Sequence, residues 1–412
     1  MLRFFSNYKN VEKDILFLMM AELFLQLINS SFTLILNIYM THSGFNDSEI
    51  ATFVSYRFMA ALVFALPFGL YIRTKAIRPI LLLSSAILPF ISLLILEAIV
   101  WKSSLLIAFS MIIWGFCFTA NQIAILPFIL RNTKTETHTE SISLNASVWS
   151  LATIASGFLI YLLSGINVQI FDERTLLQIF SLLGIFSFLF TWKISNKESI
   201  PQFTSKENGK RFDYDWVVIG KAVVPTFLIA VGAGLSIPFM NLFFFHIFKL
   251  SSGSFSLLGS ITAVVVALFS LQAPVIKNRF GYEAITATQM LSIAALILLG
   301  TTEFLGAGTF AFYLAAFCYI IRQPLMNLAN PMTSQMTMYY VGKKNQELVS
   351  AIISSIWSGS WFFSALMFRY LRGKEISYGA IIYITAAFYL IAVLFYHLLI
   401  KDFRRKEQLG LV

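Results

Sequence analysis

Apolar stretches about 20 residues long recur along the whole sequence, and this feature leaves few folds open. Twelve are present, at approximately 15–40, 49–71, 79–100, 104–130, 142–163, 175–194, 217–245, 255–276, 283–302, 309–331, 348–369 and 378–400. A helix needs about 20 apolar residues to cross a bilayer core about 30 Å thick. Only 12% of the residues are charged, against about 25% in an average soluble domain. The sequence therefore predicts an all-α polytopic membrane protein with twelve transmembrane helices.

Lys and Arg residues are distributed unevenly between the connecting segments. If both termini are cytoplasmic, the cytoplasmic segments hold 21 of them and the opposite segments hold 6. Positive charge concentrates on the cytoplasmic side of membrane proteins. We therefore expect cytoplasmic termini and a multi-pass protein of the cell membrane, which in a bacterium is the inner membrane. The net charge of +10 then faces anionic headgroups, which makes membrane lipids partners and argues against nucleic acid.

The chain divides into two halves that repeat each other. The longest polar interruption predicts a six-helix bundle at 1–194, a cytoplasmic linker at 195–215 and a second six-helix bundle at 216–412. Four features recur at offsets of 201 to 208 positions: FCFTANQ with FCYIIRQ (116–122, 317–323), NIYMTH with NLFFFH (37–42, 241–246), SVWS with SIWS (147–150, 355–358), and Glu97 with Glu303. Corresponding helices also point the same way, as a parallel repeat requires.

This arrangement resembles the major facilitator superfamily, whose transporters have twelve helices in two parallel six-helix halves. The family signature between its second and third helices is G-x-L-a-D-R-x-G-R-[KR], with an echo between the eighth and ninth. Here the first copy, GLYIRTKAIR, has Arg73 in the position of the acid, and the second, PVIKNRFG, has Asn278 there. Both copies lack the carboxylate to which a gating role is ascribed in the family. The resemblance implies alternating access, with a cavity lined by the first, fourth, seventh and tenth helices.

Several kinds of chemistry have no motif in this sequence. No G-x-x-x-x-G-K-[ST] loop is present to hold ATP phosphates, so a gradient must supply the energy. The four histidines, His42, His138, His246 and His397, are scattered, and no His-x-x-x-His or paired-carboxylate motif occurs. We therefore expect no enzyme, no metal site and no cofactor. Cys117 and Cys318 occupy corresponding positions inside helices and are interpreted as small core residues.

Ionisable residues deep in the apolar stretches are the main functional candidates. Such residues are normally turned inward, since each costs about 2.5–3.5 kcal/mol near the bilayer centre. Glu22 and Arg57 lie at similar depth in the first two helices and are the candidates for proton coupling; a purely structural ion pair is the alternative. Gln26 and Asn29 follow Glu22 at i+4 and i+7, so the three form one polar stripe.

Arg322 has no acidic residue deep in its own half of the chain. It could pair with Glu22, bond to backbone carbonyls or bind an anionic substrate. Lys221 lies near a helix end and is interpreted as an interface anchor. The predicted substrate-binding residues are Arg322, Gln26, Asn29, Asn121, Gln122, Asn241, Gln323, Asn327 and Asn330.

Helix-breaking residues interrupt the seventh and tenth helices. Membrane helices tolerate such breaks only beside protein or a watery cavity. They are either hinges or places of close helix packing through small residues. The hinge candidates are Gly232, Gly234, Pro238, Pro324 and Pro331.

These features predict a monomeric secondary active transporter that moves a small organic solute by alternating access, with proton coupling and a site between the halves. Two deep arginines against one glutamate favour an anionic solute. One alternative is a proton-coupled exporter of drugs or amphipathic compounds, although the fifth helix, SVWSLATIASGFLIYLL, lacks the G-x-x-x-G-P-x-x-G-G motif of such antiporters in the resembled family. A second alternative is a receptor that keeps the fold without transport.

Overall fold

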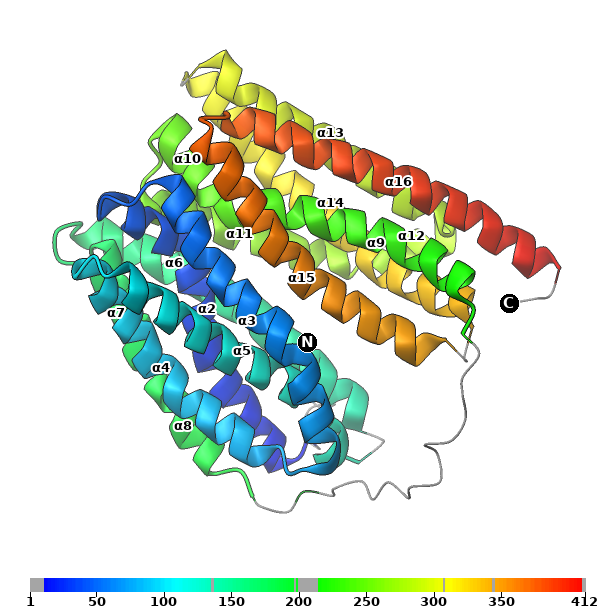
Figure 1. Ribbon diagram of the computed structural model, residues 1–412, viewed down its shortest axis with the longest axis horizontal. Helices are drawn as coiled ribbons and strands as arrows, with labels where there is room; N and C mark the ends of the chain where they lie inside the picture. Colours follow the sequence, from blue (N-terminus) through cyan, green and yellow to red (C-terminus); the bar gives the residue numbers. More distant parts are fainter. Residues whose placement is uncertain are drawn as a thin grey trace. The chain divides into compact units, whose positions relative to one another are not determined.

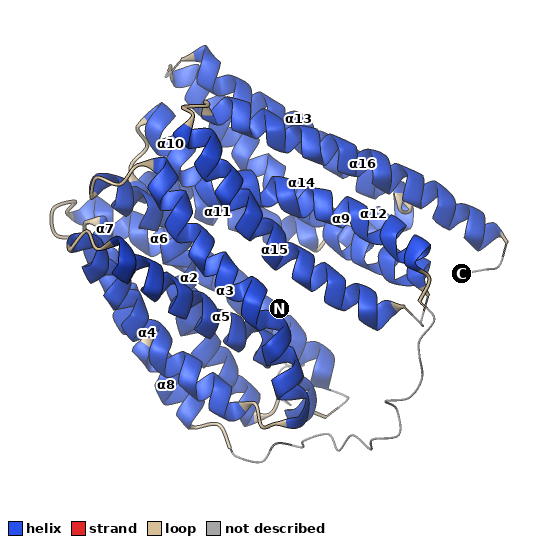
Figure 2. Cartoon of the chain, viewed as in Figure 1, coloured by secondary structure: helices blue, strands red, loops and turns tan. Residues whose placement is uncertain are grey.

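The computed structural model describes residues 11–134, 137–195, 198, 214–306, 308–342 and 345–409. Within these ranges the chain is helical and contains no strand (Figure 2). Twelve helices there are long and apolar enough to cross a membrane. The twelve predicted spans are thereby confirmed, and the two that extend furthest beyond their predicted ends are Thr309–Val341 and Tyr378–Gln408.

The chain forms two compact units, and each takes in the start of one helix from the other half of the sequence. Unit 1 contains Met1–Phe45, Tyr56–Gly209 and Ser252–Ser260; unit 2 contains Asn46–Ser55, Lys210–Ser251 and Ile261–Val412. The two exchanged segments occupy corresponding places in the sequence repeat. The domain limits at 194 and 216 stay a prediction.

The helices of the first half of the sequence pack around α2. Within unit 1 it packs mainly against α6, α7 and α8, and α4 packs against α5, α7 and α8. Gly184 joins α7 to α8 at a point where a Cβ atom would overlap the Ile28 side chain. The helices are α2 (Lys13–His42), α3 (Asp47–Thr74), α4 (Arg78–Val100), α5 (Ser104–Asn132), α6 (His138–Ile166), α7 (Glu173–Leu183) and α8 (Ile185–Trp192).

The second half of the sequence repeats this packing around α9. Here α9 packs against α15 and α16, and α13 packs against α14 and α16. Figure 1 colours these helices from green to red. The pairings match those of the first half, so the predicted two-bundle repeat is confirmed. The elements are α9 (Trp216–Ser236), η4 (Ile237–Phe239), α10 (Met240–Phe248), α11 (Ser252–Ser270), α12 (Ala273–Phe280), α13 (Glu283–Thr301), η5 (Thr302–Leu305), α14 (Thr309–Val341), α15 (Gln346–Gly373) and α16 (Tyr378–Gln408).

Side-chain caps and prolines set several helix limits. Asp172 accepts a hydrogen bond from Thr175 N at the start of α7, and Asp215 does the same from Val218 N at the start of α9. Pro238 lies in the 3-10 turn η4, which separates α9 from α10, because proline has no N–H to continue an α-helix. In α14, by contrast, Pro324 and Pro331 lie within one continuous helix.

Candidate functional site

Glu22 lies within α2 in unit 1, and 1% of this residue is exposed. Three amide groups donate to its carboxylate: Gln26 Nε2 to Oε1 at 2.6 Å, Asn121 Nδ2 to Oε2 at 2.8 Å, and Gln122 Nε2 to Oε1 at 3.0 Å. A buried charge is costly unless hydrogen bonds compensate it, and these three partners are neutral. The structure thus gathers four of the predicted site residues, from α2 and α5, into one hydrogen-bonded group.

Arg57 on α3 connects to this group through Asn29. Arg57 Nη2 donates to Asn29 Oδ1 at 2.7 Å, and Asn29 Nδ2 donates to Gln26 Oε1 at 3.0 Å. The guanidinium also lies 3.8 Å from the ring centroid of Trp114, a cation–π contact that contributes about 0.5–2 kcal/mol. Among the ion pairs of the described residues, none joins Glu22 to Arg57. Two amide side chains therefore separate the two predicted proton-coupling residues.

Arg322 lies within α14 in unit 2, and 1% of this residue is exposed. Its Nε and Nη1 atoms have no hydrogen-bond partner among the described residues. Tyr389 on α16 lies within interaction distance of the guanidinium, and Ser292 Oγ donates to the Arg322 backbone carbonyl at 3.1 Å. The helix and Tyr389 thus position a buried cation that keeps two donor atoms unsatisfied within the described part of the chain.

The other predicted site residues of unit 2 lie on α14 and α10. Asn327 Nδ2 donates to the Gln323 carbonyl at 2.9 Å, and Asn330 Nδ2 donates to Asn327 Oδ1 at 3.1 Å. These three residues therefore form a polar row along α14. Asn241 is buried on α10, where its Oδ1 accepts a hydrogen bond from Leu242 N at 2.9 Å.

Gly232 and Gly234 lie where α9 meets its neighbours most closely. A Cβ at Gly232 would lie 2.8 Å from Cε1 of Tyr389, and one at Gly234 would lie 2.9 Å from the Trp361 Cα atom. Close packing thus accounts for both glycines, and Gly232 makes room for the ring that contacts Arg322. A hinge role for these glycines, and for Pro238, Pro324 and Pro331, stays a prediction.

Glu198 supplies a carboxylate to the loop before α4, where the family signature lacks its acid. Glu198 Oε2 accepts from Ile77 N at 2.7 Å and Oε1 accepts from Arg78 N at 2.6 Å. Its side chain is 3% exposed, and Arg131 Nη1 lies 3.8 Å from Oε2. Arg131 also donates to the Lys75 carbonyl at 2.9 Å. Glu198 therefore caps the first N–H groups of α4, where a negative charge is favourable.

Further polar contacts join other segments at this end of unit 1. Glu12 Oε1 accepts hydrogen bonds from Lys134 N and Thr137 Oγ1, both at 3.0 Å. Burial raises the pKa of Glu12, but these hydrogen bonds outweigh burial and hold the pKa below its ordinary value. Asp14 accepts hydrogen bonds from the backbone N and the hydroxyl of Ser195. The start of α2 is thus hydrogen-bonded to the segments that follow α5 and α8.

We expect Glu198→Ala to lower the thermal stability of the purified protein. The substitution leaves two N–H groups of α4 without their acceptor, a loss of about 1–2 kcal/mol. The apparent melting temperature in detergent measures the effect. Glu407→Ala is the matched control, since it removes the same charge from an exposed position on α16. Equal melting temperatures for the two variants would contradict the capping role.

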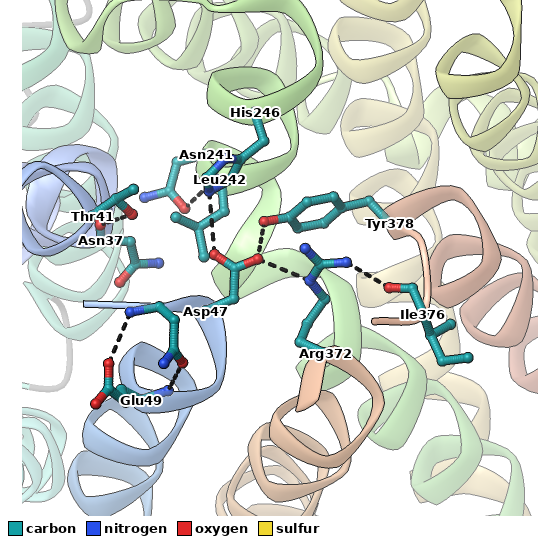
Figure 3. Close-up of polar contacts among 11 residues, drawn as sticks. Asn37, Thr41, Asp47, Glu49, Asn241, Leu242, His246, Arg372, Ile376 and Tyr378 are labelled. Atoms are coloured by element: carbon teal, nitrogen blue, oxygen red, sulfur yellow. Dashed lines mark hydrogen bonds and ion pairs between the residues drawn. The ribbon is translucent and has the colours of Figure 1, made fainter. Parts of the chain in front are cut away.

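Asp47, at the start of α3, is the centre of a second polar cluster that sequence patterns did not indicate. Its Oδ2 accepts hydrogen bonds from the Arg372 Nε at 2.8 Å and from the Tyr378 hydroxyl, while Oδ1 lies 3.2 Å from His246 Nε2 (Figure 3). Arg372 also donates to the Ile376 carbonyl at 2.6 Å. All of these residues belong to unit 2. Asp47 and Arg372 are 325 positions apart, so their pairing becomes visible only in the fold.

Lys221, which lies near the start of a predicted span, has an acidic partner. Its Nζ lies 3.1 Å from Asp402 Oδ2, and the Tyr340 hydroxyl donates to the same oxygen at 2.6 Å. The Lys221 side chain is 54% exposed. Its environment therefore differs from that of the buried Arg322, and it is not a candidate for substrate binding.

Comparisons with known proteins find similarity in fold. No family model and no curated protein matches this sequence. A mutant form of the nucleoside transporter NupG matches with a TM-score of 0.74 at 14% identity, over 94% of this chain and 99% of that one. The POT family transporter PepTSo matches with a TM-score of 0.75 at 11% identity, over 96% of this chain and 99% of that one. A D-xylose-proton symporter matches with a TM-score of 0.72 at 12% identity, over 93% of this chain and 96% of that one.

These similarities agree with the features of the chain itself. The names of two of these proteins state different solutes, a nucleoside and D-xylose, so the shared fold does not carry one substrate with it. The twelve candidate spans and the repeated helix pairings give the same architecture independently. The chain is a multi-pass membrane protein with the fold of the major facilitator superfamily.

Proposed function

We propose that the protein is a secondary active transporter of the cell membrane that moves a small organic anion by alternating access, with protons as the coupling ion. The observation that carries the proposal is the burial of Glu22 and Arg322, each 1% exposed, on helices long enough to span a membrane. Ionisable residues at such depth are rare and typically mark proton relays or substrate pathways. The solved transporters with this fold add support for transport.

The hydrogen bonds of Glu22 suit a side chain that gains and loses a proton. Two amides donate to Oε1 and one donates to Oε2. A proton on Oε2 would leave both donations to Oε1 in place, and the Asn121 amide would need to reorient. Arg57 is held by Asn29 and Trp114, so its own contacts do not depend on the charge of Glu22. A directly bonded ion pair would lack this independence.

The unsatisfied donors of Arg322 support an anionic substrate. A buried guanidinium whose Nε and Nη1 atoms lack partners among the described residues has a large desolvation cost that an anionic oxygen would offset. Carboxylates and phosphate esters have the matching chemistry. The net positive charge of the deep residues, Arg57 and Arg322 against Glu22, favours the same class of solute.

A ligand screen followed by flux measurements tests this function. The purified protein is heated with organic carboxylates, phosphate esters and cationic amphipathic compounds. A ligand at 100 times its Kd stabilises the folded state by about 2.7 kcal/mol. We expect anions to raise the melting temperature and to accumulate in proteoliposomes under a pH gradient. Stabilisation by cations alone would point to the exporter alternative, and stabilisation without flux would point to a receptor.

A further inference from the structure

Corresponding helices of the two repeats carry, in their last turn, a histidine that lies close to a carboxylate. At the end of α2, His42 Nδ1 lies 3.4 Å from Glu173 Oε1, within unit 1. At the end of α10, His246 Nε2 lies 3.2 Å from Asp47 Oδ1, within unit 2. The two histidines close the repeated motifs NIYMTH and NLFFFH. The repeat therefore provides two versions of one pair for comparison.

The surroundings of the two pairs differ. The His42 side chain is 51% exposed and Glu173 is 19% exposed, whereas the values are 32% for His246 and 9% for Asp47. Glu173 accepts a neutral hydrogen bond from Ser252 Oγ at 2.6 Å. Asp47 instead binds the Arg372 cation and the Tyr378 hydroxyl through Oδ2, which leaves Oδ1 facing the imidazole (Figure 3). The Asp47 pair is thus the more buried and the more strongly charged of the two.

The geometry makes the contact between His246 and Asp47 depend on charge. His246 Nε2 lies 3.2 Å from Asp47 Oδ1, a distance that fits both a hydrogen bond and an ion pair. A hydrogen bond from a charged donor to a carboxylate is about twice as strong as one between neutral groups. A protonated imidazole would therefore bind Asp47 much more strongly than a neutral one.

We propose that His246 and Asp47 form a proton-binding site in unit 2, separate from Glu22, and that its proton fastens the first turns of α3 to this unit. Histidine changes charge between about pH 5 and 8, and the partly exposed imidazole is accessible to water. Residues 46–55 belong to unit 2. The proton would thus control how firmly these residues are held within unit 2.

Other ionisable groups of the adjacent elements leave His246 as the switching group. Arg372 is engaged by Asp47 Oδ2 and the Ile376 carbonyl, and its guanidinium lies 4.1 Å from the centroid of the Tyr378 ring. Tyr378 stacks against His246 at 5.9 Å and donates its hydroxyl to Asp47. The remaining ionisable residues on α3, α10, α15 and the loop before α16 near this end are exposed: Glu49, Lys249, Arg369, Lys374 and Glu375. Glu303 of η5 is half-buried and accepts a hydrogen bond from Gly379 N at the start of α16.

Hydrogen exchange of the full chain in detergent tests the site without any substrate. Amide exchange of residues 47–55 is followed by mass spectrometry at pH 8 and pH 5.5 and is corrected for the intrinsic pH dependence of exchange. In the wild type, protection should rise about five- to tenfold at the lower pH, the difference between a charge-assisted and a neutral contact. In His246→Gln, protection should be the same at both pH values.

The repeat supplies the matched control, His42→Gln, which should keep the wild-type response. Asp47→Asn provides a second test should His246→Gln fail to fold, since it removes the charge that attracts the imidazole and should also abolish the response. A wild-type protection that does not change with pH would overturn the proposal, as would a full response in His246→Gln or Asp47→Asn. Because the readout needs no flux, the transport function and this site can fail separately.

Discussion

Glu22→Gln is expected to abolish accumulation of the solute under a pH gradient while preserving exchange of solute in counterflow. The glutamine has a similar shape but cannot bind and release a proton. Binding and release of the solute would therefore no longer be coupled to proton movement down the pH gradient. Counterflow needs only solute binding and the conformational cycle, neither of which requires a change of charge at residue 22. The measurement is uptake of labelled solute into proteoliposomes, with and without the pH gradient.

The hydrogen bonds of Glu22 also predict how well this variant folds. The introduced amide would place an NH₂ group among three amide groups that donate to Glu22 in the wild type. At least one of these three donors would lose its acceptor unless its own amide group rotates to present its oxygen. A cost of about 1–3 kcal/mol follows, and intact counterflow would show that the folded protein survives it. Glu97→Gln is the control, because Glu97 forms an ion pair with Arg174 at 2.7 Å and is 36% exposed. Accumulation in Glu22→Gln that still depends on the pH gradient would refute the assignment.

Arg322→Met is expected to eliminate ligand binding without loss of folding stability. Because two donor atoms of the buried guanidinium are unsatisfied within the described residues, an apolar side chain of similar length should leave the free energy of unfolding unchanged or raise it by about 1–4 kcal/mol. Arg322→Lys should weaken anion binding about 10- to 100-fold, since a lysine offers a point charge in place of the planar fork.

Two melting curves per variant, with and without the stabilising anion, measure both effects. Lys221→Met is the matched control, because it removes a cation that is exposed and already paired with Asp402, and it should keep the ligand-induced shift. A melting temperature of ligand-free Arg322→Met far below that of the wild type would show instead that Arg322 holds the fold together.

Patterns within single helices were sufficient to predict the architecture. The apolar stretches gave the spans because only a helix satisfies its backbone inside a bilayer. Glu22, Gln26 and Asn29 could be placed on one face of a helix from their spacing, and they form one hydrogen-bonded series in the structure. The length of α14 was underestimated, because its last turns, up to Val341, are polar in sequence yet continue the helix.

Contacts between distant segments could not be predicted from one sequence. Periodicity shows which residues share a face but not which helices are neighbours. Asn121 reaches Glu22 across 99 positions, Glu198 reaches Arg78 across 120, and Arg372 reaches Asp47 across 325. Glu198 in particular lay in a segment interpreted as a linker, whereas its carboxylate caps α4.

Water access to corresponding positions beside Glu22 and Arg322 tests the central claim most directly. In a chain with Cys117 and Cys318 replaced by alanine, single cysteines are introduced at Gln122, at Gln323 and, as a control, at Phe317, which is 62% exposed on α14. The account predicts that a charged, membrane-impermeant thiol reagent labels the first two cysteines in membrane vesicles, whereas only a lipid-soluble reagent labels the control. Labelling of Gln122→Cys and Gln323→Cys by the lipid-soluble reagent alone would place these residues against acyl chains and contradict the transport function.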